Sequence, residues 1–386
     1  MFTLFLMFYK MRLQVVAFQV PAPPTYGGVM DVYYRLKALK QAGVDVTLHT
    51  FYYADRTPLT DLSDIASKVY YYKRSTGLAS QISKHPYIVK SRQNDELLHN
   101  LLKESAPILF EGLHTCYYLS HPSLSDRVKF VRMHNIESDY YRELANVSTN
   151  LRDRLFFRLE SIKLKVFESK IAEASAIFAT SDSDTRYLKK KYPDVKIFTS
   201  PCCHPDDKRG YSPTNSGEPY CIYHGNFTVA ENIKAATYLI KNVAGRLDMP
   251  LYIAGKNAKS LNKKSNPATV RIVSDPKPAE LQTLISNAKA NLLITFQPTG
   301  LKLKLLNALN WGGFCVVNDK MLAGTHLAPT CIVANTSAGI IQTVNTLKEK
   351  IWSSDDEVLR QETIKLYDND RSIEPILNML KSYEKH

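Results

Sequence analysis

Short apolar runs that predict buried strands alternate along this chain with longer segments of helical periodicity. Residues 13–18 form a strand-like run, residues 29–42 have a helical pattern that ends at Gly43, and residues 44–50 form a second strand-like run. This β-α-β order predicts a parallel sheet with helices on its faces. The same alternation continues through strand-like runs at 108–110, 128–132 and 176–179.

A segment without periodicity divides the alternation into two halves. Residues 201–219, PCCHPDDKRGYSPTNSGEP, are rich in Pro, Gly, Ser and Asp and are typical of a linker. The alternation then begins again, with strand-like runs at 220–223, 251–254 and 291–295. We therefore predict an α/β fold of two Rossmann-like doubly wound domains facing a central cleft, with ligands at the carboxyl ends of the strands. The predicted domains are 1–205 and 206–367, and a helix at about 368–386 is expected to return to the first domain.

Composition limits the partners of this chain. Hydrophobic residues make up 44% and charged residues 23% of the 386 positions, which is typical of globular proteins rather than disordered ones. The net charge of +13 favours an anionic partner or surface. No nucleic-acid-binding motif is present in the sequence, so we expect no nucleic acid as a partner.

The six cysteines and the first ten residues bear on cellular location. The cysteines form no CxxC pair, which favours reduced thiols in a cytoplasmic protein and no metal site. The opening MFTLFLMFYK is apolar but shorter than the roughly 20 residues that cross a bilayer. We expect Met11 rather than Met1 to be the true start, the alternative being a small tail that dips into a membrane.

Glycines follow the first predicted strand, where a phosphate group often binds. Gly27 and Gly28 either form a simple turn or let backbone amides approach a ligand at the start of a helix. The sequence contains neither GxGxxG nor GxxxxGK[ST], which counts against NAD-linked oxidoreduction and P-loop phosphoryl transfer.

Two histidines also follow predicted strands. His114 lies in EGLHT and His134 in RMHNIE. A histidine at a strand's carboxyl end can bind a sugar hydroxyl or move a proton near neutral pH. The alternative is a surface histidine without a task, which is less plausible for two histidines that face one predicted cleft.

Glycine and lysine gather at three strand ends of the second half. Gly225 and Asn226 follow one strand, Lys256 follows another, and Thr299-Gly300-Leu301-Lys302 opens a helix that also carries Lys304. Cations at a helix N-terminus are unfavourable unless an anion is present. We therefore predict a cradle for a diphosphate, the alternative being that Lys302 and Lys304 extend into water.

With these motifs in place, the whole chain resembles the retaining glycosyltransferases of the GT-B fold that transfer sugars from nucleotide donors in bacterial surface polysaccharide synthesis. The resemblance rests on YGGV at 26–29, RMHNIE at 132–137, SDSD at 181–184, Gly225-Asn226 and TGLKLKLLNALNWGG at 299–313. It implies transfer of a hexose from a nucleotide-diphosphate sugar to a saccharide or lipid-linked saccharide, with retention and without a metal or other cofactor.

The resemblance also implies roles for individual residues. His114 and His134 would be the catalytic histidines, which contact the donor sugar or position the acceptor. Asn135 and Glu137 would lie on the acceptor side. The donor would contact Gly27, Gly28, Gly225, Asn226, Lys256, Thr299, Gly300, Lys302, Lys304 and Asn307.

The chain departs from the family pattern at four positions. Many members carry two glutamates where Thr299 and Asn307 stand, and an arginine and a lysine where Asn226 and Glu231 stand. These departures leave open a catalytically weak carbohydrate-binding relative. A sugar-nucleotide epimerase is the other alternative, although few acidic residues lie at the predicted strand ends.

A basic helix is predicted over residues 150–174. Its apolar positions 151, 155, 159, 162 and 166 lie on one side. We expect this side to face the core. The alternative is peripheral contact with the inner face of an acidic membrane, where lipid-linked acceptors lie.

Overall fold

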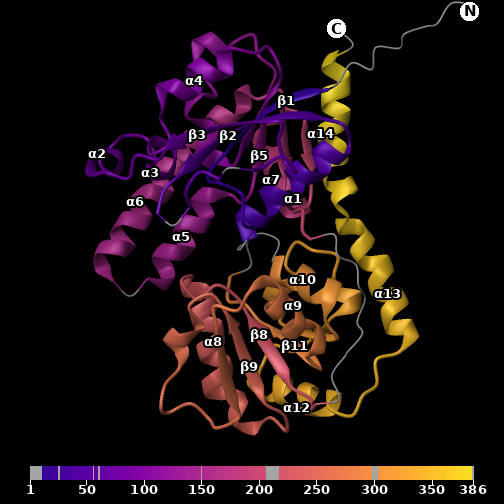
Figure 1. Ribbon diagram of the computed structural model, residues 1–386. Helices are drawn as coiled ribbons and strands as arrows, with labels where there is room; N and C mark the ends of the chain where they lie inside the picture. Colours follow the sequence, from indigo (N-terminus) through magenta and orange to yellow (C-terminus); the bar gives the residue numbers. More distant parts are fainter. Residues whose placement is uncertain are drawn as a thin grey trace, which may run out of the picture. The chain divides into compact units, whose positions relative to one another are not determined.

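The computed structural model describes residues 11–24, 27–54, 56–59, 61–148, 150–205, 217–297 and 303–384. The chain divides into two compact units (Figure 1). The first comprises residues 1–24, 28–203 and 369–386, and the second comprises residues 25–27 and 204–368. The final helix therefore belongs to the first unit, although the sequence of the second unit separates it from the rest.

The described part of the first unit is built on a seven-stranded parallel sheet with the order β3-β2-β1-β4-β5-β6-β7. Its strands are β1 (Arg12–Ala17), β2 (Asp45–Tyr52), β3 (Lys68–Lys73), β4 (Ile108–Glu111), β5 (Lys129–Met133), β6 (Ala176–Ala179) and β7 (Ile197–Thr199). Its helices are α1 (Gly27–Gln41), α2 (Leu78–Gln81), α3 (Tyr87–Lys90), α4 (Asp95–Leu102), α5 (Glu137–Val147), α6 (Leu151–Phe167), α7 (Asp182–Lys191) and α14 (Asn369–Glu384).

The central strands of the first unit bury both of their faces, whereas the edge strands β3 and β7 are only partly buried. Successive residues of a strand point to opposite faces, so Val15 and Val16 of β1 belong to two different core clusters. Helices cover the sheet on both sides, and Ile376 of α14 packs into the same cluster as Val15. Burial on both faces explains why these strands are continuous apolar runs rather than alternating ones.

The described part of the second unit contains a six-stranded parallel sheet with the order β10-β9-β8-β11-β12-β13. Its strands are β8 (Cys221–His224), β9 (Leu251–Gly255), β10 (Val270–Ser274), β11 (Ala290–Leu293), β12 (Phe314–Val317) and β13 (Ile332–Val333). Its helices are α8 (Ala230–Asn242), α9 (Pro278–Asn287), α10 (Leu303–Trp311), α11 (Asp319–Leu322), α12 (Ser337–Leu347) and α13 (Ser354–Ile364).

Short 3-10 helices connect several of these elements in the two units. They are η1 (Leu113–Tyr118), η2 (Pro122–Leu124), η3 (Glu168–Glu173), η4 (Ala244–Arg246), η5 (Ala258–Leu261), η6 (Ala328–Thr330) and η7 (Lys365–Tyr367).

Both sheets confirm the predicted α/β class, and each reverses its strand order at one point. In the first unit the reversal lies between β1 and β4, and in the second between β8 and β11. Loops diverge at such a point, which leaves space for a ligand beyond the carboxyl ends of the strands. The candidate residues are therefore best sought where these four strands and their neighbours end.

One expectation about α6 is wrong. Its apolar positions 151, 155, 159, 162 and 166 do not face the core, because all five side chains are at least half exposed. The buried side of the helix is formed by Glu160, Leu164 and Phe167. The helix therefore carries two apolar sides, and the sequence pattern indicated the one that faces solvent. Among the residues that the structure describes, no helix has both the length and the apolar character needed to cross a membrane.

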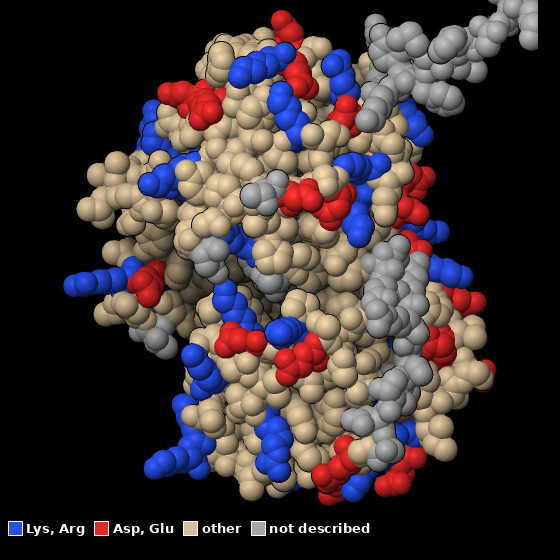
Figure 2. Space-filling model, viewed as in Figure 1, with Lys and Arg blue, Asp and Glu red and all other residues tan. Residues whose placement is uncertain are grey.

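Charge is spread over the molecular surface in the view of Figure 2. Lys and Arg side chains are mixed there with Asp and Glu and do not gather in one large patch. The net charge of +13 therefore does not mark a single binding face on this side of the molecule.

Candidate functional site

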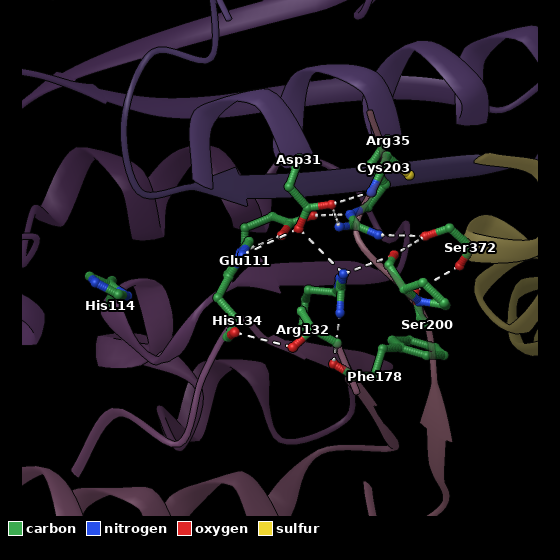
Figure 3. A network of polar contacts seen from close by, with 12 residues as sticks. Asp31, Arg35, Glu111, His114, Arg132, His134, Phe178, Ser200, Cys203 and Ser372 are labelled. Carbon is green, nitrogen blue, oxygen red and sulfur yellow. Dashed lines mark hydrogen bonds and ion pairs between the residues drawn. The ribbon is translucent and has the colours of Figure 1, made fainter. Parts of the chain in front are cut away.

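A buried cluster of acidic and basic side chains lies at the carboxyl ends of β4 and β5 (Figure 3). Glu111 is the last residue of β4, His134 follows β5, and Asp31 comes from α1. The His134 ring lies between the two carboxylates, with Nε2 2.9 Å from Glu111 Oε2 and Nδ1 3.3 Å from Asp31 Oδ2. Burial by itself would lower the pKa of His134, but hydrogen bonds and charges of Asp31 and Glu111 outweigh it and raise that pKa.

Two fully buried arginines balance the two carboxylates. Arg35 Nε donates to Glu111 Oε1 at 3.0 Å, and the Arg35 guanidinium also pairs with Asp31. Arg132 Nη2 donates to Asp31 Oδ2 at 3.3 Å. Burial favours the neutral form of each carboxyl group, but Arg35 and its neighbours lower the pKa of both Asp31 and Glu111. The carboxylates therefore stay ionised, as buried charges do when they are paired.

The cluster also ties distant parts of the chain to the sheet. Arg35 Nη1 donates to Ser372 Oγ of α14 at 3.3 Å, and Arg132 Nη2 donates to the Pro201 carbonyl at 3.2 Å. The Cys203 amide donates to Asp31 Oδ1 at 2.7 Å. Figure 3 shows these contacts converging on one set of side chains. The cluster is therefore structural as well as polar, and it fixes the place of His134.

A second pair of polar side chains lies beside this cluster without being ion-paired. His114 Nδ1 is 3.9 Å from Glu137 Oε1, too far for a hydrogen bond. Neither atom has a hydrogen-bond partner among the residues that the structure describes. The side chain of Glu137 is only 2% exposed. Buried polar atoms normally have partners, so this pair is a natural place for a polar ligand.

The charge states of this second pair follow from burial. Burial raises the pKa of Glu137 to about 7, although His134 and a hydrogen bond from the Asn135 side chain oppose the shift. Burial and the nearby Arg92 hold the pKa of His114 well below its usual range. At neutral pH, His114 is therefore an uncharged imidazole, and Glu137 titrates close to the working pH, which suits proton transfer.

Two glycines and an aromatic ring set the spacing of the histidines. Gly112 has a φ of 79°, and a Cβ there would lie 2.9 Å from His114 Nδ1 and 3.2 Å from His134 Cδ2. The Phe18 ring lies 5.4 Å from the His114 ring and 5.5 Å from the His134 ring. A Cβ on Gly28 would lie 3.1 Å from Phe18 Cζ. Glycine at 28 and 112 thus makes room for the rings.

Of the two interpretations of Gly27 and Gly28, the simple turn is wrong. Both residues form the first turn of α1, and neither has a positive φ. The structural reason for glycine at 28 is the Phe18 ring, as described above. The loop residues Thr25 and Tyr26 that precede these glycines lie outside the described residues.

Glycines also permit close packing at the carboxyl edge of the second sheet. Gly255 has a φ of 140°, and a Cβ there would lie 2.0 Å from the Gly225 carbonyl oxygen. A Cβ on Gly225 would in turn lie 3.2 Å from Asn232 Cγ. Asn226 Oδ1 accepts hydrogen bonds from the Thr228 amide at 3.0 Å and from Thr228 Oγ1 at 2.8 Å. The Asn226 side chain thus organises the turn between β8 and α8.

Glu231 and Asn318 fix the chain that leaves β11. Glu231 Oε1 accepts from Thr295 Oγ1 at 2.6 Å and from the Phe296 amide at 2.5 Å. The Asn318 side chain donates to the Thr295 carbonyl at 2.7 Å and accepts from the Thr295 amide at 3.1 Å. These bonds fix the backbone immediately before the segment that contains Thr299, Gly300 and Lys302. Those three predicted residues lie outside the described residues.

The other residues predicted for the second unit differ in exposure. Lys304 Nζ donates to Asn232 Oδ1 at 2.5 Å and to the Tyr223 hydroxyl at 3.1 Å. Burial and the nearby charge of Lys304 lower the pKa of His224, the last residue of β8, to about 3. Lys256 is exposed just beyond β9, whereas Asn307 is buried within α10. The structure thus places Lys304 and Lys256 near the carboxyl ends of adjacent strands.

Sequence reasoning missed the ion-paired part of the first cluster. Glu111 and Arg132 lie in the motifs EGLHT and RMHNIE with His114 and His134, but neither is among the predicted site residues. A charged residue inside a buried strand needs a partner, and Asp31 and Arg35 are spaced four apart on a predicted helix. Those two signals together could have indicated the network.

Comparisons with known proteins fit this architecture. No protein-family profile matches the sequence. A Klebsiella pneumoniae protein described as an uncharacterized 44.6 kDa protein in the cps region is 23% identical over 346 residues, which cover 84% of this chain and 87% of that protein.

Solved structures match over nearly the whole chain. Sucrose-phosphate synthase from Thermosynechococcus elongatus matches 97% of this chain and 100% of its own, with a TM-score of 0.69 and 12% identity. Anabaena HepE, solved in complex with UDP and glucose, matches 96% of this chain and 100% of its own, with a TM-score of 0.64 and 12% identity. A glycosyltransferase from Rickettsia africae matches 98% of this chain and 100% of its own, with a TM-score of 0.61 and 14% identity. At such identities the likeness shows the fold alone, and this chain has the two-sheet α/β fold of the GT-B glycosyltransferases.

Proposed function

We propose that this protein is a glycosyltransferase that moves a hexose from a nucleotide-diphosphate sugar to a saccharide or lipid-linked saccharide acceptor. The fold supports the class, and the HepE structure holds UDP and glucose. The relative in a cps region supports a role in bacterial surface polysaccharide synthesis. The observation that carries the proposal is the pair of buried atoms without hydrogen-bond partners, His114 Nδ1 and Glu137 Oε1, beside His134.

His114 and His134 have different roles in this proposal. Both ring nitrogens of His134 already face carboxylates, so this histidine positions the site and supplies fixed charge. His114 is uncharged and has an unpartnered Nδ1, so it contacts a sugar hydroxyl. Glu137 and Asn135 lie on the acceptor side, and Glu137 takes up a proton near neutral pH.

The second unit binds the donor diphosphate in this proposal. Negative charge builds up on the leaving phosphate oxygen as the bond between that oxygen and the anomeric carbon of the donor sugar breaks. Lys256, Lys302 and Lys304, together with backbone amides near Gly225 and Gly300, offset that charge. We propose that these groups act without a metal and that the product retains the anomeric configuration.

Donor binding is the first experiment. The full chain is melted with UDP, GDP, ADP and their sugar conjugates in the presence of a chelator. A ligand at about a hundred times its Kd adds roughly 2.7 kcal/mol of stability, a shift of a few degrees for domains of this size. We expect one base to give a shift that Lys302→Ala abolishes. Lys241→Ala is the control, because this exposed lysine lies in the last turn of α8.

Turnover distinguishes transfer from the alternatives. We expect the selected nucleotide sugar to release its nucleoside diphosphate only when a saccharide acceptor is added, and His114→Ala to lower this rate by about 100-fold or more. Conversion of the donor to an epimeric sugar would instead indicate an epimerase, which the carboxylates of Asp31, Glu111 and Glu137 make worth testing. Nucleotide binding without any turnover would indicate a binding relative.

A further inference from the structure

The solvent side of α6 is an uninterrupted apolar stripe. The exposed fractions are 75% for Leu151, 61% for Leu155, 50% for Leu159, 63% for Ile162 and 71% for Val166. These positions recur at spacings of four and three along a helix, so at about 100° per residue they fall within an arc of roughly 80°. Single exposed apolar residues are ordinary, but five along one helix face form a patch that marks an interaction site.

Contacts on the other side of α6 fix this orientation. Glu160 Oε2 accepts from the Tyr87 amide of α3 at 2.5 Å, and Ser161 Oγ donates to the Ser138 carbonyl of α5 at 2.7 Å. Phe156 and Phe157 make edge contacts with Tyr87 and Tyr141. A rotation that buried the stripe would break all of these contacts. The apolar stripe is therefore exposed because the opposite side of the helix packs against α3 and α5.

Basic side chains flank the stripe on both sides. By the same helical arithmetic, Arg158, Lys165 and Arg154 lie on one flank and Arg152 and Lys163 on the other. The acidic residues of the helix, Asp153 and Glu160, lie on the far side. Glu160 is also engaged by the Tyr87 amide and by Lys163. The exposed half of α6 is thus apolar along its centre and cationic at both edges.

The segment next to α6 adds to the same surface. Lys163 Nζ is 3.4 Å from the Gln81 carbonyl of α2, so α2 lies beside α6, as Figure 1 shows. Leu78 and Ile82, at the two ends of α2, are 76% and 83% exposed. The apolar surface of the first unit therefore continues beyond the stripe.

We propose that the α6 face, meaning the stripe of Leu151, Leu155, Leu159, Ile162 and Val166 with its flanking cations, binds the surface of a bilayer that contains anionic lipids. A helix with an apolar stripe and basic edges lies in the membrane–water interface. Its apolar side chains lie among the acyl chains, and its cations lie at the headgroup phosphates.

Other occupants fit the α6 face less well. In a symmetric pairing with a second copy, the same patch meets itself, which would bring cationic edges against cationic edges. Nucleic acid would satisfy the cations but leave the apolar stripe without a partner. A bilayer surface that contains anionic lipids matches both features.

Vesicle binding by the full chain tests this proposal. Flotation is measured with vesicles of phosphatidylglycerol and phosphatidylcholine and with vesicles of phosphatidylcholine alone. We expect binding to the anionic vesicles that weakens as salt is added. Leu155→Asn with Ile162→Asn should lower the partition coefficient by about tenfold or more. Arg152→Gln, Arg158→Gln and Lys165→Gln should each lower it by about fivefold.

Matched control variants distinguish binding by the α6 face from nonspecific binding of the protein to vesicles. Ile351→Asn removes an isoleucine that is 83% exposed in the second unit. Lys189→Gln removes an exposed lysine from α7. Both controls should bind anionic vesicles as the unaltered chain does. Circular dichroism and melting should be unchanged in all variants, since every substituted side chain is on the surface.

Three results would overturn the proposal. The first is an unaltered chain that does not float with anionic vesicles. The second is equal loss of binding in the controls and in the α6 variants. The third is a dimer in gel filtration that Leu155→Asn with Ile162→Asn dissociates, which would assign the stripe to a second copy. None of these measurements depends on sugar transfer. The proposal of membrane binding by the α6 face and the proposal of transferase activity can therefore be refuted separately.

Discussion

At the scale of single residues, the first unit uses its environment to give similar groups different charge states. Glu111 and Glu137 are both buried, but arginine beside Glu111 lowers its pKa whereas burial raises that of Glu137. His134 and His114 differ in the same way, because only His134 lies between carboxylates. Groups whose pKa values are pushed apart are typical of sites that move protons.

The raised pKa of Glu137 predicts a pH-dependent stability. Its pKa rises from about 4.5 in the unfolded chain to about 7 in the fold, so the folded chain binds the extra proton in this interval. Stability therefore falls as pH rises from about 4.5 through about 7, by roughly 3 kcal/mol in total. Glu137→Gln should remove this part of the fall, measured as the urea midpoint at pH 5 and pH 8. The control Glu143→Gln should leave the fall in place, and an unchanged slope in Glu137→Gln would refute the assignment.

Gly112 predicts a steric effect on the histidines. A Cβ would meet His114 Nδ1 at 2.9 Å and would also require a side chain at a positive φ. We expect Gly112→Ala to cost about 1–3 kcal/mol in stability and to displace the His114 ring. The imidazole resonances of the two histidines in NMR spectra report that displacement. Gly77→Ala is the control, because a Cβ there meets nothing within 4 Å, and identical spectra for both variants would count against the spacing role.

At the scale of elements, α10 ends in a way that its sequence alone does not explain. The helix ends at Trp311, and β12 begins at Phe314 after Gly312-Gly313. The structure adds that Arg360 of α13 donates to the carbonyls of Gly312 and Gly313, the latter at 2.5 Å. The guanidinium also lies 4.0 Å from the centre of the Trp352 ring. A distant arginine thus supplies the partners that the end of a helix lacks.

Removing that arginine should destabilise the second unit. Arg360→Met keeps much of the side-chain volume but leaves two carbonyls without their donor, which should cost about 2–4 kcal/mol. The measurement is urea unfolding followed by the fluorescence of Trp311 and Trp352. Lys365→Met, an exposed position at the end of the same helix, is the control. A loss no larger than that of the control would mean that water replaces the guanidinium.

The edge strands show where pattern reading is weakest. Most central strands of the two sheets were predicted because they are largely apolar runs. The edge strands β3 and β10 were not, since KVYYYK and VRIVS are only partly buried and carry charged residues. An edge strand has one free side and tolerates polar residues, so its pattern resembles that of a loop.

At the scale of the whole molecule, the first unit is completed by the end of the chain. Ile373, Ile376, Met379 and Leu380 of α14 are buried in the cluster that includes β1 and β6 residues. Ser200 Oγ donates to the Ser372 carbonyl at 2.7 Å. The core of the first unit is therefore complete only when α14 has packed against it.

This arrangement predicts a localised effect of a mutation in α14. Ile376→Ala leaves a cavity in a fully buried position and should cost about 2–5 kcal/mol. Hydrogen exchange should rise in β1 and β6 and stay unchanged in β8 and β9. Asn378→Ala, on the exposed side of the same helix, is the control. An equal rise of exchange in both sheets would show that the two units unfold together.

The sequence by itself determined the α/β class and the loops that hold the candidate residues, because strand and helix periodicities are local properties of the chain. It also indicated the histidines, since a strand's carboxyl end is a place that sequence order reveals. Tertiary structure decided which side of α6 faces solvent, because that helix has two apolar sides and only its contacts with α3 and α5 choose between them. Tertiary structure also decided the charge of each buried group, because a pKa depends on neighbours such as Asp31 and Arg35 that lie far from Glu111 and His134 in sequence.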